Sequence, residues 1–134
     1  MVSSSNKQLL VDTHIILWAL ENTSKLGPKT TASISSADQV YVSVVSLWEL
    51  AAKYKAGKRP YASQRLQVAI EMMGMQVLAL RHEHIFWFEK VILPHKDPFD
   101  ALLLAQSLSE NLSFVTADQA ILSSRYKSII DARV

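Results

Sequence analysis

The order of apolar and polar residues along the chain predicts alternating strands and helices. Five short apolar runs are predicted to form strands, at residues 9–11, 40–44, 76–80, 113–116 and 128–130. Helical spacing of apolar residues, with the residues that start and stop helices, predicts helices at 15–21, 29–37, 46–55, 62–73, 82–91, 98–110 and 117–122. Strands separated by helices favour an α/β fold whose mainly parallel sheet of four or five strands is covered on both faces.

Two residues mark where predicted helices begin and end. Pro98 suits the first turn of the helix at 98–110, because the N–H that proline lacks would have no helical partner there. Gly57 follows the helix at 46–55 and is typical of helix C-termini. The length of 134 residues suits one domain. We therefore expect residues 1–134 to form a single domain, with a flexible polar tail at residues 1–7.

Composition narrows the class of protein. Hydrophobic residues make up 49% of the chain and charged residues 19%, which favours a packed core over disorder. The lack of cysteine excludes a disulfide framework and a cysteine nucleophile, and it favours a cytoplasmic location. The three glycines are too scattered for a phosphate-binding loop. No apolar run approaches the roughly 20 residues of a membrane span, so no membrane association is expected.

The charge balance gives no sign of binding to nucleic acid through bulk charge. Lysine and arginine number 14 and aspartate and glutamate 12, for a net charge of +2. A local basic stretch near the end of the helix at 46–55 contains Lys53, Lys55, Lys58 and Arg59. These residues either complement the negative end of the helix dipole or contact an RNA backbone. The sequence leaves both interpretations open.

Four acidic residues lie where the chain leaves a predicted strand or begins the next helix: Asp12, Glu49, Asp100 and Asp118. Parallel strands end at the same edge of a sheet, and sites in such folds lie at that edge. Carboxylates brought close together repel unless a cation lies between them. Mg²⁺ and Mn²⁺ prefer such oxygen ligands, and a metal in an acidic pocket suits hydrolysis of phosphodiesters. The acids therefore predict a metal site.

The same acids also fit ordinary helix capping. The predicted caps are Asp12, Asp97, a capping box of Ser46 with Glu49, and a second box of Thr116 with Gln119 that encloses Asp118. Asp97 would precede Pro98 as an N-cap, which places Asp100 at the third helical position, where the dipole favours negative charge. Each acid taken singly is as well explained by capping as by metal binding.

Other candidate groups are weaker. His82 and His84 are two residues apart and so lie on opposing sides of a helix, which does not suit chelation. His14 and His95 lie beside the acids, where packing or hydrogen bonding is expected rather than contact with phosphate. Four aromatic residues are expected in the core or an interface rather than stacked on bases, namely Trp18, Trp48, Trp87 and Phe88.

Four segments carry a resemblance to a known family. They are L-L-V-D-T-H at residues 9–14, S-L-W-E-L at 46–50, P-H-K-D-P-F-D-A-L-L at 94–103 and V-T-A-D at 115–118. In this order they resemble the motifs of PIN-domain proteins, and more closely those of the VapC-type ribonuclease toxins of toxin–antitoxin pairs. The likeness extends along nearly the whole chain and implies a three-layer α/β/α sandwich for residues 1–134.

The resemblance also implies roles for individual residues. Asp12, Glu49, Asp100 and Asp118 match the four acids that hold Mg²⁺ or Mn²⁺ and catalyse RNA cleavage in the family, with Asp12 and Asp100 as the most direct ligands. Three further residues would support them: Thr116, Thr13 and Asp97, the last favoured as an N-cap. Apart from the resemblance, contact with the RNA backbone stays the functional alternative for Lys53, Lys58 and Arg59.

The resemblance implies partners as well as an activity. The protein would be a homodimer inhibited by a cognate antitoxin, whose apolar segment would lie over the groove near the first helix and the helix at 46–55. A basic side chain of the antitoxin would reach the acids. The alternative is a non-catalytic module of the same fold that binds RNA or protein, with its acids serving mainly as helix caps.

Overall fold

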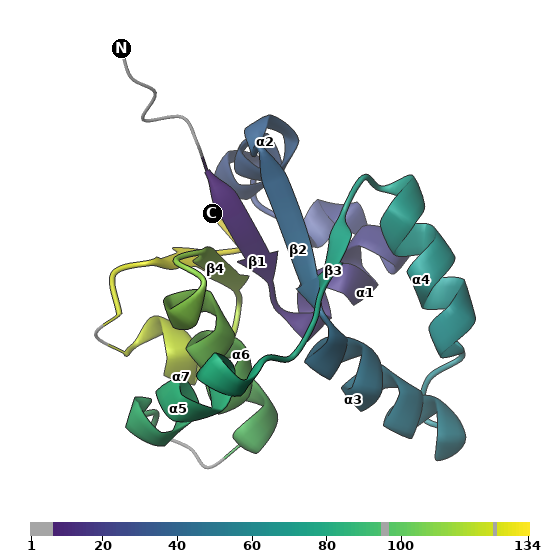
Figure 1. The fold of residues 1–134 in the computed structure, drawn as a ribbon. Coiled ribbons are helices and arrows are strands. Elements are labelled where there is room, and N and C mark those ends of the chain that lie inside the picture. The colour runs from purple at the N-terminus through teal and green to yellow at the C-terminus, as the bar shows by residue number, and fades with distance from the viewer. Residues whose placement is uncertain (1–6, 95–96, 125) are drawn as a thin grey trace.

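The computed structural model describes residues 7–94, 97–124 and 126–134. Within them, five parallel strands form one sheet in the order β3-β2-β1-β4-β5 (Figure 1). They are β1 (Gln8–Val11), β2 (Gln39–Ser43), β3 (Gln76–Leu78), β4 (Ser113–Thr116) and β5 (Ile129–Asp131). The predicted parallel sheet is confirmed, with β1 at its centre. Of the predicted tail, residues 1–6 lie outside the described part.

The helices fall close to their predicted positions. They are α1 (Thr13–Glu21), α2 (Pro28–Ser36), α3 (Val44–Lys55), α4 (Ser63–Met72), α5 (His82–Lys90), α6 (Pro98–Ser109) and α7 (Gln119–Leu122), with a 3-10 turn η1 (Thr23–Lys25). The prediction for α3 was wrong at its start, because this helix begins at Val44. The Ser43 hydroxyl accepts a hydrogen bond from the Val45 amide at 2.9 Å, so it caps the helix directly at the end of β2.

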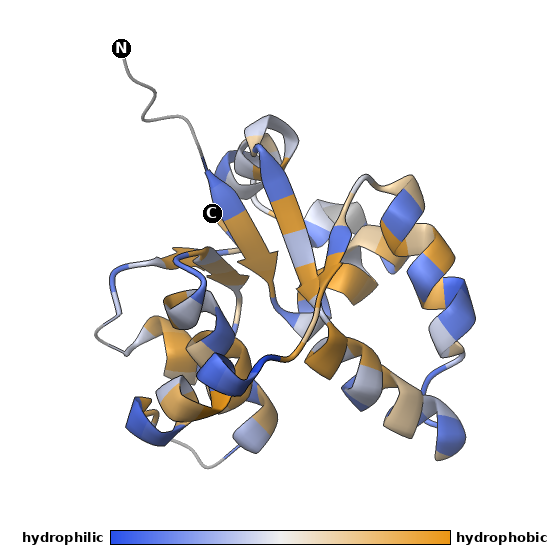
Figure 2. Cartoon of the chain, viewed as in Figure 1, coloured by the Kyte–Doolittle hydropathy of each residue, from blue (hydrophilic) through white to orange (hydrophobic). Residues whose placement is uncertain are grey.

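Alternate positions along the strands fill two separate cores. Leu9 and Val11 lie in one core with residues of α1, α3 and α4, while Leu10 lies in the other with Leu103 and Leu104 of α6. Figure 2 shows apolar residues along β1 and β4, apolar residues alternating with more polar ones along β2, and apolar stretches on the helices that pack against the sheet. The sheet therefore lies between two helical layers, which confirms the predicted three-layer α/β/α sandwich.

The segments that carry the motif residues meet at one edge of the sheet. Because the strands are parallel, β1, β2 and β4 all end at this edge, where Asp12, α3 and the segment before α7 begin (Figure 1). Trp48 of α3 contacts Phe99 in the first turn of α6, with ring centroids 5.2 Å apart in an edge-to-face arrangement. The start of α6 is thereby held near α3 at the same edge.

Glycines end two helices as expected from their freedom to adopt positive φ. Gly57 has φ of 73° after α3, and Gly74 has φ of 75° after α4. The amide of Lys58 then donates to the Lys53 carbonyl at 2.8 Å, and that of Met75 to the Ile70 carbonyl at 3.0 Å. The predicted capping role of Gly57 is confirmed. Among the helices of the described residues, none is both long and apolar enough to cross a membrane.

Gly27 is required for a different reason, namely the close approach of another backbone segment rather than a positive φ. Its amide donates to the Ala132 carbonyl at 2.9 Å, and the Thr30 amide donates to the Val134 oxygen at 2.9 Å. A Cβ on Gly27 would lie 2.1 Å from the Val134 carbonyl carbon, far inside van der Waals contact. The start of α2 and the last described residues therefore pack together only if residue 27 has no side chain.

We expect Gly27→Ala to lower the free energy of unfolding by about 1–3 kcal/mol, because backbone must move to admit the methyl group. Urea unfolding followed by circular dichroism measures the change. Lys29→Ala is the control, since Lys29 is exposed in the first turn of the same helix. Equal effects of the two substitutions would contradict the assigned contact.

Candidate active site

Asp12 is buried at the carboxyl end of the central strand, with 2% of its surface exposed. One carboxylate oxygen, Oδ1, accepts a hydrogen bond from the Thr13 amide at 2.7 Å. The other, Oδ2, accepts one from the Thr116 hydroxyl at 2.7 Å. Asp12 is thus the N-cap of α1, as the capping interpretation predicted, and its carboxylate is also fixed by the last residue of the neighbouring strand.

Burial and neighbouring groups act on the Asp12 carboxyl in opposite directions. Burial raises the pKa of Asp12 and is the largest effect, because it disfavours the charged form. Hydrogen bonds from Thr116 and Thr13 and the charge of His14 lower this pKa, while the negative charge of Asp118 raises it further. The net result is a raised pKa, and Asp118 lies close enough to contribute to it.

Asp118 is itself a helix cap. It precedes α7, and its Oδ1 accepts from the Ile121 amide at 3.0 Å. Its own amide donates to the Thr116 hydroxyl oxygen at 3.0 Å, so Thr116 touches both acids. The predicted capping box of Thr116 with Gln119 was wrong, because α7 begins at Gln119 and Asp118 takes the capping position.

Glu49 reaches the same edge from the second turn of α3. Its Oε1 accepts from the Thr13 hydroxyl at 3.0 Å, and the Ser46 hydroxyl lies 2.8 Å from the same Thr13 oxygen. Its Oε2 lies 3.4 Å from the Lys53 ammonium, one helical turn later. The predicted capping box of Ser46 with Glu49 was wrong, because α3 begins earlier and both side chains turn to Thr13 instead.

Asp97 and Asp100 lie at the start of α6. The Asp97 carboxylate accepts from the amides of Phe99 at 2.9 Å and Asp100 at 3.4 Å, which confirms the N-cap favoured for it. Asp100 is half-buried in the first turn of this helix. The neighbouring motif residue His95, for which packing was expected, lies outside the described residues together with residue 96.

Comparison with known proteins identifies the family. The family model of the PIN domain matches residues 9–126. The chain belongs to the PIN-domain family. No curated protein matches it significantly.

Solved structures share the fold of this PIN domain at low sequence identity. DNA-bound VapBC from Salmonella typhimurium is 16% identical with a TM-score of 0.65, covering 93% of this chain and 98% of that one. A toxin–antitoxin complex from Klebsiella pneumoniae is 15% identical with a TM-score of 0.63, covering 92% and 97%. VapBC2 from Rickettsia felis, bound to a DNA fragment from the promoter, is 16% identical with a TM-score of 0.60, covering 92% and 96%. At these identities the likeness shows the fold.

The carboxylate oxygens of this PIN-domain site are the ligand type that Mg²⁺ and Mn²⁺ prefer, but they do not surround a single metal position. Asp12, Glu49 and Asp118 are linked through Thr13 and Thr116. Among residues 7–94, 97–124 and 126–134, no group of three acidic or histidine side chains is placed to hold one metal ion. The carboxylates are therefore neighbours at one edge, and the predicted metal cage is not preformed.

Two contacts of the PIN-domain site were not expected from the sequence. The ion pair of Lys53 with Glu49 has the i, i+4 spacing that favours such pairs, so this signal was present. It places Lys53 beside a site acid, whereas the sequence predicts a dipole role or an RNA contact for this residue. The contact between Thr13 and Ser46 joins residues 33 positions apart and has no local signal.

Of the four aromatic residues expected in the core or an interface, one packs against a core and three are exposed, and for those three an interface role stays a prediction. Trp18 is half-buried against the first core. The other three are exposed, by 64% for Trp48, 40% for Trp87 and 37% for Phe88, so they are not core residues. Trp48 and Phe88, with Phe99, help to line an apolar hollow of about 270 Å³ between α3, α5 and the start of α6.

We expect Asp12→Asn to raise the midpoint of thermal unfolding at pH 7 by a few degrees. The folded protein holds the Asp12 pKa above its ordinary value of 3.8, so ionised Asp12 costs stability above the raised pKa. Asparagine removes that charge and keeps an oxygen for the Thr13 amide. The gain should shrink as the pH falls toward 3.8, where the aspartate takes up a proton in both states. Melting curves over a pH series measure it.

The control is Asp38→Asn, because Asp38 is exposed directly before β2. It should leave the midpoint nearly unchanged at every pH. A lower midpoint for Asp12→Asn at pH 7 would show instead that the charged carboxylate stabilises the fold as a cap.

Proposed function

We propose that this protein is an Mg²⁺- or Mn²⁺-dependent endoribonuclease that acts as the toxin of a toxin–antitoxin pair. The observation that carries the proposal is the Asp12 carboxylate, buried at the end of the central strand of a PIN domain and fixed by two donors. Glu49 and Asp118 lie beside it through the hydroxyls of Thr13 and Thr116. A cytoplasmic location and one PIN domain over residues 1–134 belong to the same proposal.

The bound metal would orient and acidify water and neutralise charge that develops on the phosphate. Side chains of the protein orient the carboxylates that would bind the metal. Thr116 orients Asp12 and the backbone of Asp118, and the hydroxyl of Thr13, the residue after Asp12, donates to Glu49. We assign Asp100, at the start of α6, to the same ligand set. These hydroxyls fix carboxylates in the way that outer hydrogen-bond partners tune metal ligands.

Basic residues would bind the RNA substrate beside this site. Lys53 lies next to Glu49, and Lys58 and Arg59 follow the end of α3. The phosphate backbone supplies most of the electrostatic attraction in such contacts. We propose that the end of α3 guides RNA toward the acids, although bulk charge is close to balance.

A protein antitoxin is the expected partner. The solved structures that share the fold include a toxin–antitoxin complex and two VapBC structures. We propose that an apolar antitoxin segment covers the groove beside α1 and α3, with a basic side chain directed at the acids. Trp48, 64% exposed next to Glu49, offers an apolar contact for this segment.

A homodimer completes the proposal, with its contact placed on α5. Four consecutive residues of this helix, 85–88, are apolar and between 37% and 53% exposed, which is typical of interaction surfaces. Sedimentation velocity should therefore show a dimer, and Phe86→Glu should give a monomer. Val68→Glu is the control, because Val68 is equally exposed on α4. A wild-type monomer would refute this part of the proposal.

Metal-dependent cleavage of RNA by the purified protein is the main test. Asp12→Asn and Asp100→Asn should each lower the cleavage rate by about 100-fold or more, because each removes charge that faces the metal and phosphate. Asp38→Asn should leave the rate unchanged. Wild-type cleavage that persists in EDTA, or in both site variants, would overturn the catalytic assignment. If cleavage depends on the metal and on these acids, sequencing of RNA ends after induced expression would identify the RNA substrate.

One observation favours the non-catalytic alternative, in which the acids are mainly caps. Asp12, Asp97 and Asp118 all accept backbone N–H bonds at helix starts. Melting curves with and without Mg²⁺ distinguish the two functions, because a ligand stabilises only the state that binds it. Stabilisation by Mg²⁺ that disappears in Asp12→Asn supports the enzyme. Equal curves with and without Mg²⁺ support the caps.

A further inference from the structure

A buried chain of hydrogen bonds runs behind the site and joins α3 to α6. It begins at Ser43, the last residue of β2, whose hydroxyl accepts from the Val45 amide and donates to the Oε1 of Gln106. Both Ser43 and Gln106 have no exposed surface. A buried side-chain amide needs partners for its oxygen and its nitrogen, so this bond fixes the orientation of Gln106.

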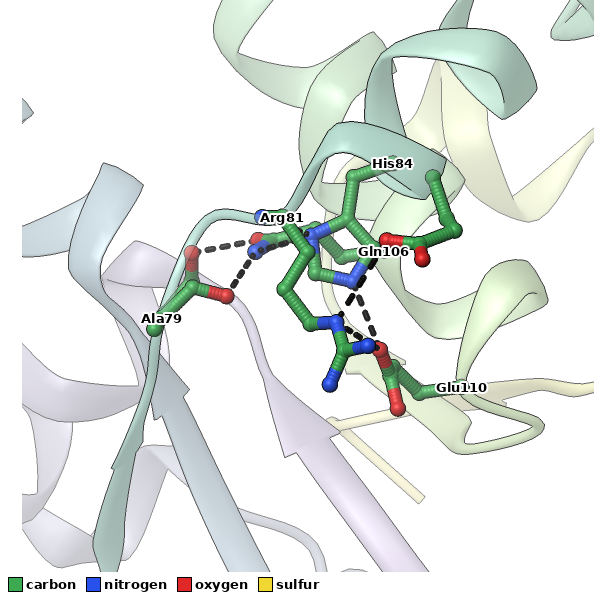
Figure 3. Close-up of polar contacts among 7 residues, drawn as sticks. Ala79, Arg81, His84, Gln106 and Glu110 are labelled. Carbon is green, nitrogen blue, oxygen red and sulfur yellow. Dashed lines mark hydrogen bonds and ion pairs between the residues drawn. The ribbon is translucent and has the colours of Figure 1, made fainter.

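The chain continues from Gln106 into α5 (Figure 3). The Gln106 amide nitrogen lies 3.2 Å from His84 Nδ1 and 3.5 Å from the Ala79 carbonyl oxygen. His84 Nδ1 also accepts from the Arg81 amide at 2.9 Å, and His84 Nε2 lies 2.8 Å from Glu110 Oε2. Two donors face Nδ1 and a carboxylate faces Nε2, so the imidazole carries its proton on Nε2.

These bonds attach α5 to the rest of the molecule. Within α5, all of whose residues are described, His84 alone is buried. The apolar residues that follow it are exposed, so a polar side chain anchors this helix on α6. Because Gln106 bonds to both Ser43 and His84, it ties α3 and α5 to one point on α6.

The location of Ser43 connects this chain to the acids. Ser43 caps α3, and α3 carries Ser46 and Glu49 toward Thr13. The opposite helix, α6, carries Asp100 in its first turn and Gln106 in its middle. The separation between Glu49 and Asp100 is therefore set by how α3 docks on α6, and the bond between Ser43 and Gln106 fixes the buried side of that contact.

We propose that Gln106 is a positioning residue, which sets the separation of the two acid-bearing helices through Ser43. Its effect on catalysis rests on the proposed nuclease function, whereas its effect on helix position does not. Gln106 acts through α3 and does not itself touch substrate. Trp48 and Phe99 join the same two helices on the exposed side, so the loss of Gln106 loosens the contact without separating the helices.

The test compares Gln106→Met, Ser43→Ala and the double variant with the full-length wild-type chain. Methionine keeps the length of the side chain and removes both polar atoms. Ser107→Ala is the matched control, because Ser107 is the next residue of α6, is equally buried, and its hydroxyl donates within its own helix, to the Leu104 carbonyl. All variants are compared well below their unfolding midpoints, which urea denaturation supplies.

The first readout is the position of α3 relative to α6 in the metal-free protein. The chain has no cysteine, so spin labels can be attached at Ala52→Cys on α3 and Ser109→Cys on α6. Pulsed electron resonance then gives the distance distribution between them, with unlabelled protein added to suppress signals between copies. Gln106→Met and Ser43→Ala should each broaden or shift the distribution, and Ser107→Ala should leave it unchanged.

The second readout is chemical. For RNA cleavage, Gln106→Met should lower kcat by about 10-fold with KM within about 2-fold, since misplacement of catalytic groups acts on the chemical step. Binding of Mn²⁺ alone, followed by its electron resonance signal, should weaken by about 10-fold. The double variant should lose less kcat than the product of the two single losses, because both substitutions break the shared bond between Ser43 and Gln106, while each also removes contacts of its own.

An unchanged distance distribution in Gln106→Met, or an unchanged kcat despite lower stability, would overturn the positioning role. If Gln106→Met does not fold, Ser43→Ala removes the same bond together with the Ser43 cap of α3, and an unchanged distance distribution in this variant overturns the positioning role. If the wild type neither binds Mn²⁺ nor cleaves RNA, the proposed function fails, together with the catalytic part of this inference. The distance measurement still decides whether Gln106 positions α3.

Discussion

The candidate site depends on a buried carboxylate at the end of the central strand. Asp12 has almost no contact with water, and its two oxygens are held by a backbone amide and by the Thr116 hydroxyl of the next strand. A buried charge is tolerated only when such partners replace water. The parallel pairing of β1 with β4 is what places Thr116 opposite Asp12. The neighbouring acids are then arranged through Thr13 and Thr116.

Some acidic residues are both helix N-caps and candidate metal ligands, and the geometry of the parallel sheet explains why. In this parallel sheet α1, α3 and α7 start where a strand ends, so their free backbone N–H groups point toward that edge. Acids placed there stabilise helix starts and also collect at one edge. Asp12, Asp97 and Asp118 are caps in this structure, and that role holds their carboxylates in fixed orientations. A cap is thus a means of positioning a ligand.

Helix α5 reverses the usual relation between polarity and burial. Its histidine is buried in hydrogen bonds, while residues 85–88 present apolar side chains to the surface. An amphipathic surface helix usually buries its apolar side chains and exposes its polar ones. The polar anchor keeps α5 in place while its apolar side chains stay exposed, and it connects α5, through Gln106, to the start of α3.

Local pattern was enough to determine the order of elements, the Gly57 cap and the Asp97 cap, because each depends on residues within a few positions of one another. The parallel sheet followed from the alternation of strands with helices. The sequence also predicted that the motif acids share one edge, since parallel strands share their ends, and the structure connects three of them, Asp12, Glu49 and Asp118, through Thr13 and Thr116. Tertiary structure alone decided that Ser46 turns to Thr13, that Gln106 meets Ser43, and that Trp48 is exposed. These contacts join residues far apart in the chain, and their geometry is set by how helices dock on the sheet, which local periodicity does not encode.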